Sequence, residues 1–79
     1  MRARIKTLMA SLFEVAVGDI PDDAQFGVLK GWDSLGHIAL MMAVESEFGV
    51  ALTTESMQNA LTLPALEDFI AAAVKEKRP

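Results

Sequence analysis

The chain has no cysteine among its 79 residues. This absence excludes disulfide bonds, thiolate metal sites and a cysteine nucleophile. It also fits a reducing compartment, so we expect a cytoplasmic location. The sequence has a single histidine, His37, which cannot belong to a multi-histidine metal site, and we expect no bound metal.

Long apolar runs are missing as well. The longest covers residues 38–44, which is far too short to cross a bilayer. Met1 is followed by Arg2, Arg4 and Lys6 without a continuous apolar segment, so we expect neither a membrane anchor nor a secretory signal. The length is near the lower limit for a self-sufficient core, but a hydrophobic content of 52% predicts one small domain over residues 1–79.

Positive charge is scarce in the middle of the chain. Lys30 is the only Lys or Arg between Lys6 and Lys75, and all of the eleven Asp and Glu residues except Glu76 lie in that span. Such a surface repels phosphate backbones, so we expect no nucleic-acid ligand. The acidic surface would attract proteins with basic docking patches. Acidic charge also keeps small proteins soluble, and the charge pattern alone favours this simpler explanation.

The spacing of apolar residues predicts an all-α fold, a four-helix bundle. We expect three longer helices, over residues 2–15, over Ser34–Phe48 and after a cap at Thr62, with a short third helix that begins after Thr53 or Thr54 and ends at Asn59. The first helix should end near Gly18. Its expected buried stripe consists of Ile5, Leu8, Met9, Leu12 and Val15, and that of the last helix consists of Leu63, Leu66, Phe69, Ile70 and Ala73.

A long loop over residues 18–32 joins the first two predicted helices. Loops of this length in small domains are usually functional or held in place by their own apolar residues. A calcium loop beginning at Asp19 fails, because Pro21 and Ala24 occupy positions that need a ligand and a glycine. The expected anchors of the loop are Ile20, Phe26, Val28, Leu29 and Trp32.

The second helix is expected to have apolar residues on two sides, with Asp33 as its N-cap and Gly49 as its stop signal. One side faces the core and combines Leu40, Met41, Val44 and Phe48 with His37. The other side carries Leu35, Ile38 and Met42, near Glu45. This second side is either enclosed by the rest of the domain or needs a partner to cover it, and the pattern leaves both possibilities open.

Ser34 stands at the start of this helix, where free N–H groups and the helix dipole favour a bound anion. A phosphate carried on Ser34 would be stabilised there. Ser34 and His37 do not form a hydrolase site, because they lie one helical turn apart and no nucleophile elbow is present. We therefore expect no catalytic activity.

Residues 31–40 around Ser34 have the sequence GWDSLGHIAL, and residues 42–49 continue as MAVESEFG. This segment, and most specifically Asp33-Ser34-Leu35, resembles the phosphopantetheine attachment segment of acyl and peptidyl carrier proteins. The length, the acidity, the helix order and the long loop agree with the same family. The resemblance implies a four-helix bundle in which Ser34, flanked by Asp33 and Leu35, carries covalent 4′-phosphopantetheine.

The resemblance also implies partners. A phosphopantetheinyl transferase would modify Ser34 from coenzyme A with magnesium. A loading enzyme would place an acyl or aminoacyl group on the arm's thiol as a thioester, and downstream transferases or synthases would receive it. The implied role is a non-catalytic, monomeric carrier in fatty acid, lipid or secondary-metabolite biosynthesis.

Two further sets of residues follow from the resemblance. Partner docking would involve Leu35, Ile38, Met42, Glu45 and Glu47, and an acyl pocket would be lined by Leu40, Met41, Val44 and Phe48.

The sequence departs from the carriers of fatty acid synthesis, because Gly36 stands where Asp is common and Ala39 where Glu is common. This departure favours a specialised stand-alone carrier on a dedicated pathway. The alternative is an unmodified acidic protein-interaction module with the carrier fold.

Overall fold

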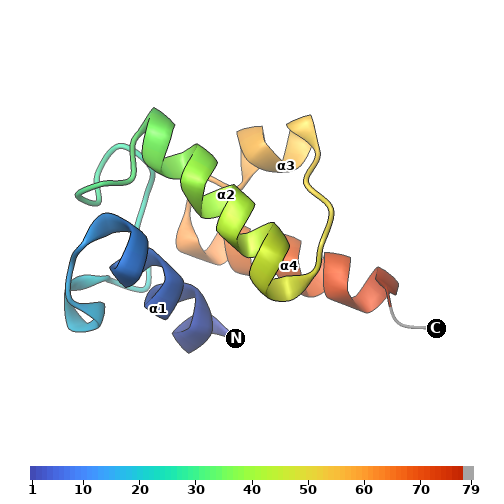
Figure 1. Cartoon of the computed structure of the whole chain (residues 1–79), viewed down its shortest axis with the longest axis horizontal. Helices are drawn as coiled ribbons and strands as arrows, with labels where there is room; N and C mark the ends of the chain where they lie inside the picture. The colour runs from blue at the N-terminus through green and yellow to red at the C-terminus, as the bar shows by residue number, and fades with distance from the viewer. Residues whose placement is uncertain (78–79) are drawn as a thin grey trace.

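Four α-helices and one short 3-10 helix account for most of residues 1–77, the part of the chain that the computed structural model describes. The helices pack together, and the loop that joins α1 (Arg2–Phe13) to α2 (Ser34–Phe48) lies at the end of the bundle where α2 begins (Figure 1). The expected all-α, four-helix architecture is confirmed. The elements are α1 (Arg2–Phe13), η1 (Val17–Asp19), α2 (Ser34–Phe48), α3 (Thr54–Asn59) and α4 (Leu63–Lys77).

The end of α1 differs from the prediction. The helix stops at Phe13, because Glu14 adopts a left-handed conformation with φ 56°, and the N–H groups of Glu14 and Val15 both donate to the carbonyl of Ala10. Left-handed residues at helix ends are usually glycine, so a glutamate gives no sequence signal for this stop. Gly18, the expected terminator, lies inside η1 instead.

The buried stripe of α1 changes accordingly. Ile5, Met9 and Phe13 are the buried residues, whereas Leu12 is 38% exposed. Leu8 and Val15 are half-buried against the core, although Val15 lies beyond the helix. The prediction was wrong about the last turn because the stripe continues through Phe13, at the i+4 position from Met9.

The other helix boundaries are confirmed. The carboxylate of Asp33 accepts a hydrogen bond from the N–H of Gly36 at 2.9 Å, and Gly49 closes α2 with φ 66°. Thr53, rather than Thr54, caps α3 through reciprocal hydrogen bonds with Ser56. Thr62 caps α4 by accepting from the N–H of Ala65 at 3.1 Å.

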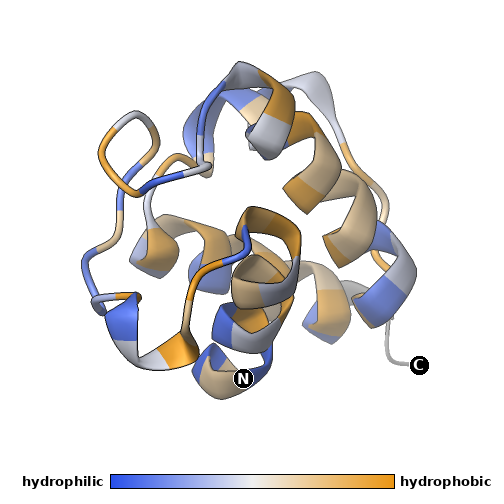
Figure 2. Cartoon of the chain, turned by 60° about the vertical axis from the view of Figure 1, so that its left-hand side comes forward, coloured by the Kyte–Doolittle hydropathy of each residue, from blue (hydrophilic) through white to orange (hydrophobic). Residues whose placement is uncertain are grey.

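The loop before α2 is anchored both to the core and to the α3–α4 junction. Ile20 and Trp32 are buried. An antiparallel bridge pairs Gln25 with Thr62, with the N–H of Phe26 donating to the carbonyl of Leu61 at 2.8 Å. Figure 2 shows that hydrophobic residues occur along this connection as well as in the helices.

Val28 is not an anchor of the loop, contrary to the prediction. Its side chain is 78% exposed, because it sits in a tight turn between Gly27 and Gly31, which have φ values of 82° and 89°. The turn is closed by a hydrogen bond from the N–H of Gly27 to the carbonyl of Trp32 at 2.8 Å. The other two expected anchors, Phe26 and Leu29, are half-buried.

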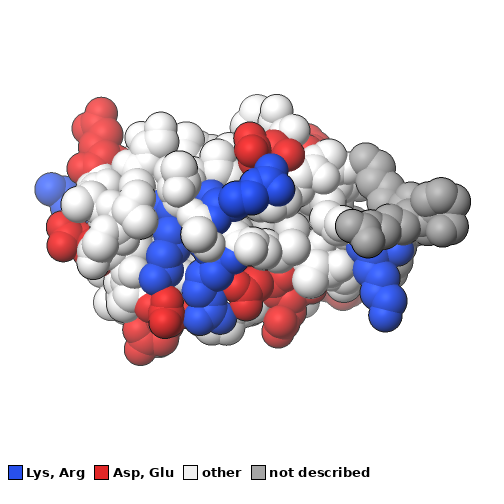
Figure 3. Space-filling model, turned by 90° about the horizontal axis from the view of Figure 1, so that it is seen from below, with Lys and Arg blue, Asp and Glu red and all other residues white. Residues whose placement is uncertain are grey.

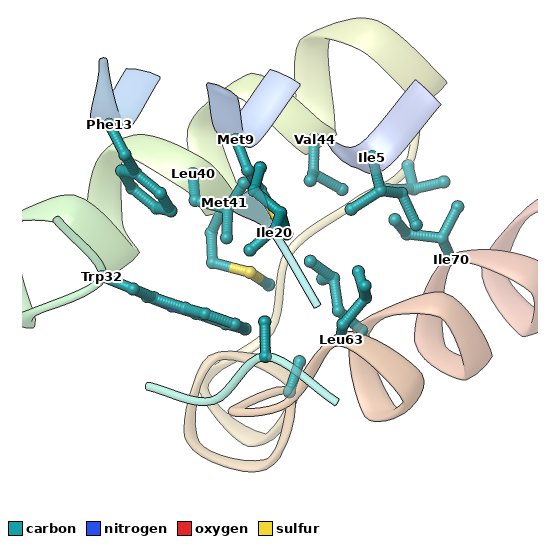
Figure 4. Close-up of a cluster of buried hydrophobic side chains, with 14 residues drawn as sticks. Ile5, Met9, Phe13, Ile20, Trp32, Leu40, Met41, Val44, Leu63 and Ile70 are labelled. Atoms are coloured by element: carbon teal, nitrogen blue, oxygen red, sulfur yellow. The ribbon is translucent and has the colours of Figure 1, made fainter. Parts of the chain in front are cut away.

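The core lies between α1, α2 and α4, with Trp32 from the loop closing one end (Figure 4). α2 contributes side chains with no exposed surface, and Phe48 near its end is half-buried beneath the guanidinium carbon of Arg4, which lies 4.5 Å from the ring centroid. The residues without exposed surface are Ile5, Met9, Leu40, Met41, Val44, Leu63, Leu66 and Ile70.

Replacing Val44 with alanine should lower the free energy of unfolding by about 2 kcal/mol, because the lost methyl groups leave a cavity in this packed core. The expected fall in Tm is about 10 °C for a domain of this size. Val28→Ala is the matched control, since it removes the same atoms from a side chain that is 78% exposed. Thermal unfolding followed by circular dichroism measures both. Equal Tm changes in the two variants would contradict the assigned core.

The basic residues of α1 lie in ion pairs with distant parts of the chain. Arg2 donates two hydrogen bonds to Glu67, at 2.9 and 3.0 Å, and Lys6 donates to Asp22 at 2.6 Å. The hydrogen bond from Arg2 lowers the pKa of Glu67, and that from Lys6 lowers the pKa of Asp22. Figure 3 shows basic and acidic side chains intermixed across this face.

Within residues 1–77, no helix is both long and apolar enough to span a membrane.

Candidate functional site

Ser34 is the first residue of α2 and is exposed. Within the described chain, its hydroxyl takes part in no hydrogen bond. The N–H groups of Ser34 and Leu35 also find no acceptor there, as expected for the first turn of a helix. The hydroxyl is therefore open to an enzyme, and two N–H donors without an acceptor lie in the same first turn, where an anion is favoured.

Asp33 fixes the start of the helix. It adopts an extended conformation, and its carboxylate accepts from the N–H of Gly36 while its carbonyl accepts from the N–H of His37 at 2.7 Å. One of the free N–H groups of the first turn is thereby satisfied by the chain itself. Those of Ser34 and Leu35 remain available beside the serine oxygen.

Two buried residues hold this exposed serine from either side. The indole N–H of Trp32 donates to Nδ1 of His37 at 3.0 Å. Since Nδ1 accepts, the proton of the neutral ring is on Nε2, which donates to the carbonyl of Met57 in α3 at 2.7 Å. The chain of hydrogen bonds thus ties the loop before Ser34, the first turn after it and α3 together.

Aromatic contacts reinforce the same arrangement. The rings of Phe13 and Trp32 stack with centroids 6.4 Å apart, and Phe26 meets the edge of His37 at 5.5 Å. His37 is thus buried, and its ring links the start of α2 to α3.

Gly31 and Gly36 form a close backbone contact next to Ser34. A Cβ atom built on Gly36 would lie only 1.9 Å from the carbonyl oxygen of Gly31 and 3.2 Å from the ring of Phe13. A Cβ atom on Gly31 would lie 2.7 Å from Cβ of Phe13. The loop therefore passes against α2 at a point where only glycine fits on either side.

The second apolar side of α2 is open to solvent. Leu35 is 80% exposed, Met42 62% and Ile38 46%, so the rest of the described chain does not enclose this side. Glu45, beside this apolar side, accepts from the N–H of Leu52 at 3.3 Å, and Glu47, on the side of α2 that faces α1, forms an ion pair with Arg4 at 2.9 Å. The role of these five residues in docking stays a prediction.

The residues expected to line an acyl pocket form part of the packed core. Leu40, Met41 and Val44 have no exposed surface, and Phe48 is half-buried. None of the four lines the surface cavity of about 430 Å³ between α1 and the end of α2, which is bordered by Ala3, Arg4, Thr7, Leu8, Ser11 and Glu47. Their role in holding cargo stays a prediction. Among residues 1–77, no group of three or more His, Cys, Asp or Glu side chains is placed to hold a metal ion.

Sequence reasoning found Ser34 and its cap but missed the contacts that hold them. The Trp32–His37 hydrogen bond and the Gly31–Gly36 contact each span five residues across the helix start. The sequence signal for these contacts was the pattern on each side of Asp33-Ser34-Leu35, with Gly31 and Trp32 before it and Gly36 and His37 after it.

Comparison with known protein families agrees with this geometry. A family model described as a phosphopantetheine attachment site matches residues 3–70, which extend from α1 into α4 and include Ser34. An exposed serine oxygen beside two free N–H groups fits the covalent attachment of a phosphate-containing group.

Proposed function

The chain belongs to the phosphopantetheine attachment site family, and we propose that Ser34 is the residue to which the group is joined. The chain is thus a phosphopantetheine-carrying carrier protein, and carrier domains of this family are themselves non-catalytic. The family binds 4′-phosphopantetheine covalently. The observation that supports Ser34 is its exposed hydroxyl, without a hydrogen-bond partner in the described chain, at the first position of α2.

The residues around Ser34 have distinct parts in this proposal. Ser34 supplies the oxygen of a phosphodiester, and the N–H groups of Ser34 and Leu35 face the added negative charge from the positive end of the helix. Asp33 keeps the helix start in place through its bond to Gly36. The attached arm would supply a terminal thiol, which holds an acyl or aminoacyl group as a thioester.

Carrier domains interact with transferases and synthases, and we extend this to specific partners of the chain. A phosphopantetheinyl transferase would modify Ser34, a loading enzyme would charge the thiol, and downstream enzymes would receive the cargo. The neutral residues Gly36 and Ala39 on α2 favour a dedicated pathway over general fatty acid synthesis. We place this carrier in the cytoplasm, as a monomer that binds neither nucleic acid nor membrane.

The test is intact-protein mass spectrometry after incubation with coenzyme A, magnesium and a broad-specificity phosphopantetheinyl transferase. We expect the mass of one phosphopantetheinyl group, located by peptide mapping on the peptide that contains Ser34. An added group on a different residue would contradict the assignment of Ser34. No addition with this enzyme, nor with a transferase encoded beside the chain's own gene, would favour the alternative of an unmodified interaction module.

A further inference from the structure

His37 is a buried titratable residue whose ring uses both of its nitrogens. The ring stacks on that of Trp32 with centroids 6.2 Å apart, and it makes a T-shaped contact with Phe26 at 5.5 Å. Nδ1 accepts from the indole N–H of Trp32, and Nε2 donates to the carbonyl of Met57. One acceptor and one donor on the same imidazole require the neutral form, so both bonds exist only while the ring is uncharged.

A proton on Nδ1 of His37 would break the bond to Trp32. The indole N–H can only donate, and a protonated imidazole has a donor on each nitrogen, so two N–H groups would face each other over 3.0 Å. Trp32 is 1% exposed, so its N–H would be left buried without an acceptor, next to a buried positive charge. The bond to Met57 persists, since Nε2 donates in both forms.

No acidic side chain is placed to compensate for that charge. Within residues 1–77, His37 forms no ion pair, and neither ring nitrogen bonds to a carboxylate. On α2 itself, the nearest charged residue after the cap is Glu45, eight residues away. The ionisable residues of the neighbouring segments are engaged elsewhere or exposed: Asp33 bonds to Gly36, Asp22 pairs with Lys6, and Glu14, Asp19, Asp23, Lys30 and Glu55 are exposed.

The bond between Trp32 and His37 lies across the serine. Trp32 stands two residues before Ser34 and His37 three residues after it, and the same imidazole also holds the backbone of α3. Without the bond, fewer contacts hold the first turn of α2 to the loop, and the position of Ser34 is less well defined. An enzyme that must align the serine oxygen with its substrate reacts more slowly with such a chain.

We propose that His37 is a positioning residue for the modification of Ser34 and that only its neutral ring fulfils this role, so that the attachment site loosens in acid. This inference rests on the proposed function, because it assumes that an enzyme acts at Ser34. Imidazole groups ordinarily take up a proton at about pH 6.5. States that lack the bond to Trp32 accept this proton freely, so lowering the pH through this range favours them.

The bond can be observed directly by NMR, because Trp32 is the only tryptophan and gives one indole N–H signal. The signal is followed from about pH 8 to about pH 5, together with the ring protons of His37, the only histidine. We expect the indole signal to move as the ring titrates. An indole signal that stays unchanged while the ring titrates would overturn the proposal, and so would a ring that stays neutral until the domain unfolds.

The second measurement is kcat/KM for transfer to Ser34, with the transferase, coenzyme A and magnesium. His37→Gln is the reference, because an amide can accept from the indole N–H and donate to a carbonyl but does not titrate. The ratio of the wild-type value to that of His37→Gln cancels the pH dependence of the transferase. We expect this ratio to fall about threefold or more from about pH 8 to about pH 5.5. A purely structural histidine would give a constant ratio.

Trp32→Phe is the second variant, in case His37→Gln does not fold. It keeps an aromatic ring in the core but lacks the N–H that bonds to Nδ1 of His37 at neutral pH. Wild type should therefore lose its advantage in kcat/KM over Trp32→Phe as the pH falls. Circular dichroism over the same pH range checks that each protein compared is folded.

The outcomes separate this inference from the proposed function. If wild type receives no group at any pH, the proposed function fails and the positioning role fails with it, whereas the NMR spectra still show whether the ring controls the bond. If wild type is modified but its rate relative to the variants does not change with pH, the carrier function stands and the role of His37 is wrong.

Discussion

Replacing Ser34 with alanine should abolish phosphopantetheine attachment completely and leave the free energy of unfolding within about 0.5 kcal/mol of wild type. The loss is complete because the oxygen that would form the phosphodiester is removed. The fold should remain because the hydroxyl is exposed and makes no hydrogen bond within the described chain. Alanine also has a higher helix propensity than serine, so α2 itself is not weakened.

Ser46→Ala is the matched control. Ser46 lies on the same helix and is also exposed, so its replacement changes the same atoms on the same element. Intact mass spectrometry should show full modification of Ser46→Ala and none of Ser34→Ala, while thermal unfolding shows similar Tm values for both. Residual modification of Ser34→Ala would mean that another residue accepts the group. A large fall in its Tm would mean that the serine has a structural part.

The helices could be predicted from the sequence because their signals are local. Asp33, Gly49 and Thr62 each act on backbone groups a few residues away, as predicted. The prediction left the cap of α3 open between Thr53 and Thr54, and Thr53 is the residue that caps it. The end of α1 could not be predicted, because Glu14 takes a conformation that usually belongs to glycine. The signals that were read came from residue types typical of their positions, whereas a glutamate is not typical of a left-handed helix end.

Burial in the loop was also hard to predict, from residue type alone. Val28 has the composition of an anchor, but two glycines with positive φ turn its segment outward. Trp32 behaves as predicted, whereas its partner His37 also bonds to Met57, 20 residues further along the chain. No local pattern indicates that contact. Ser34 could be singled out as a candidate because its motif and its helix start are local, while the residues that hold it in place required the structure.

Gly36→Ala should also change the free energy of unfolding strongly. Helix propensity and tertiary packing predict opposite signs for this change. By helix propensity alone, Gly36→Ala should stabilise the protein by about 1 kcal/mol. The structure predicts the opposite, because the new Cβ atom would lie 1.9 Å from the carbonyl oxygen of Gly31, and Gly31 is itself packed against Phe13. We expect a net loss of about 3 kcal/mol in the free energy of unfolding and a fall in Tm of about 15 °C.

Gly18→Ala is the matched control for Gly36→Ala. A Cβ atom on Gly18 meets no atom within 4 Å, and its φ is not positive, so its Tm should not fall. Thermal unfolding measures both variants, and the fluorescence of Trp32, the only tryptophan, reports whether the loop is displaced in the folded fraction. A Tm of Gly36→Ala at or above that of wild type would show that the loop around Gly31 moves aside without lowering the stability, and would contradict this prediction.

The same contact explains why the aspartate that is common at this position in the resembling carriers is absent here. Gly36→Asp would add the overlapping Cβ atom together with a carboxylate, so it should be destabilised at least as much as Gly36→Ala. The absence of a charged side chain at position 36 therefore follows from the close packing of the loop against α2. A chain that packs Gly31 against Gly36 therefore cannot carry a charged side chain at position 36 without displacing the loop.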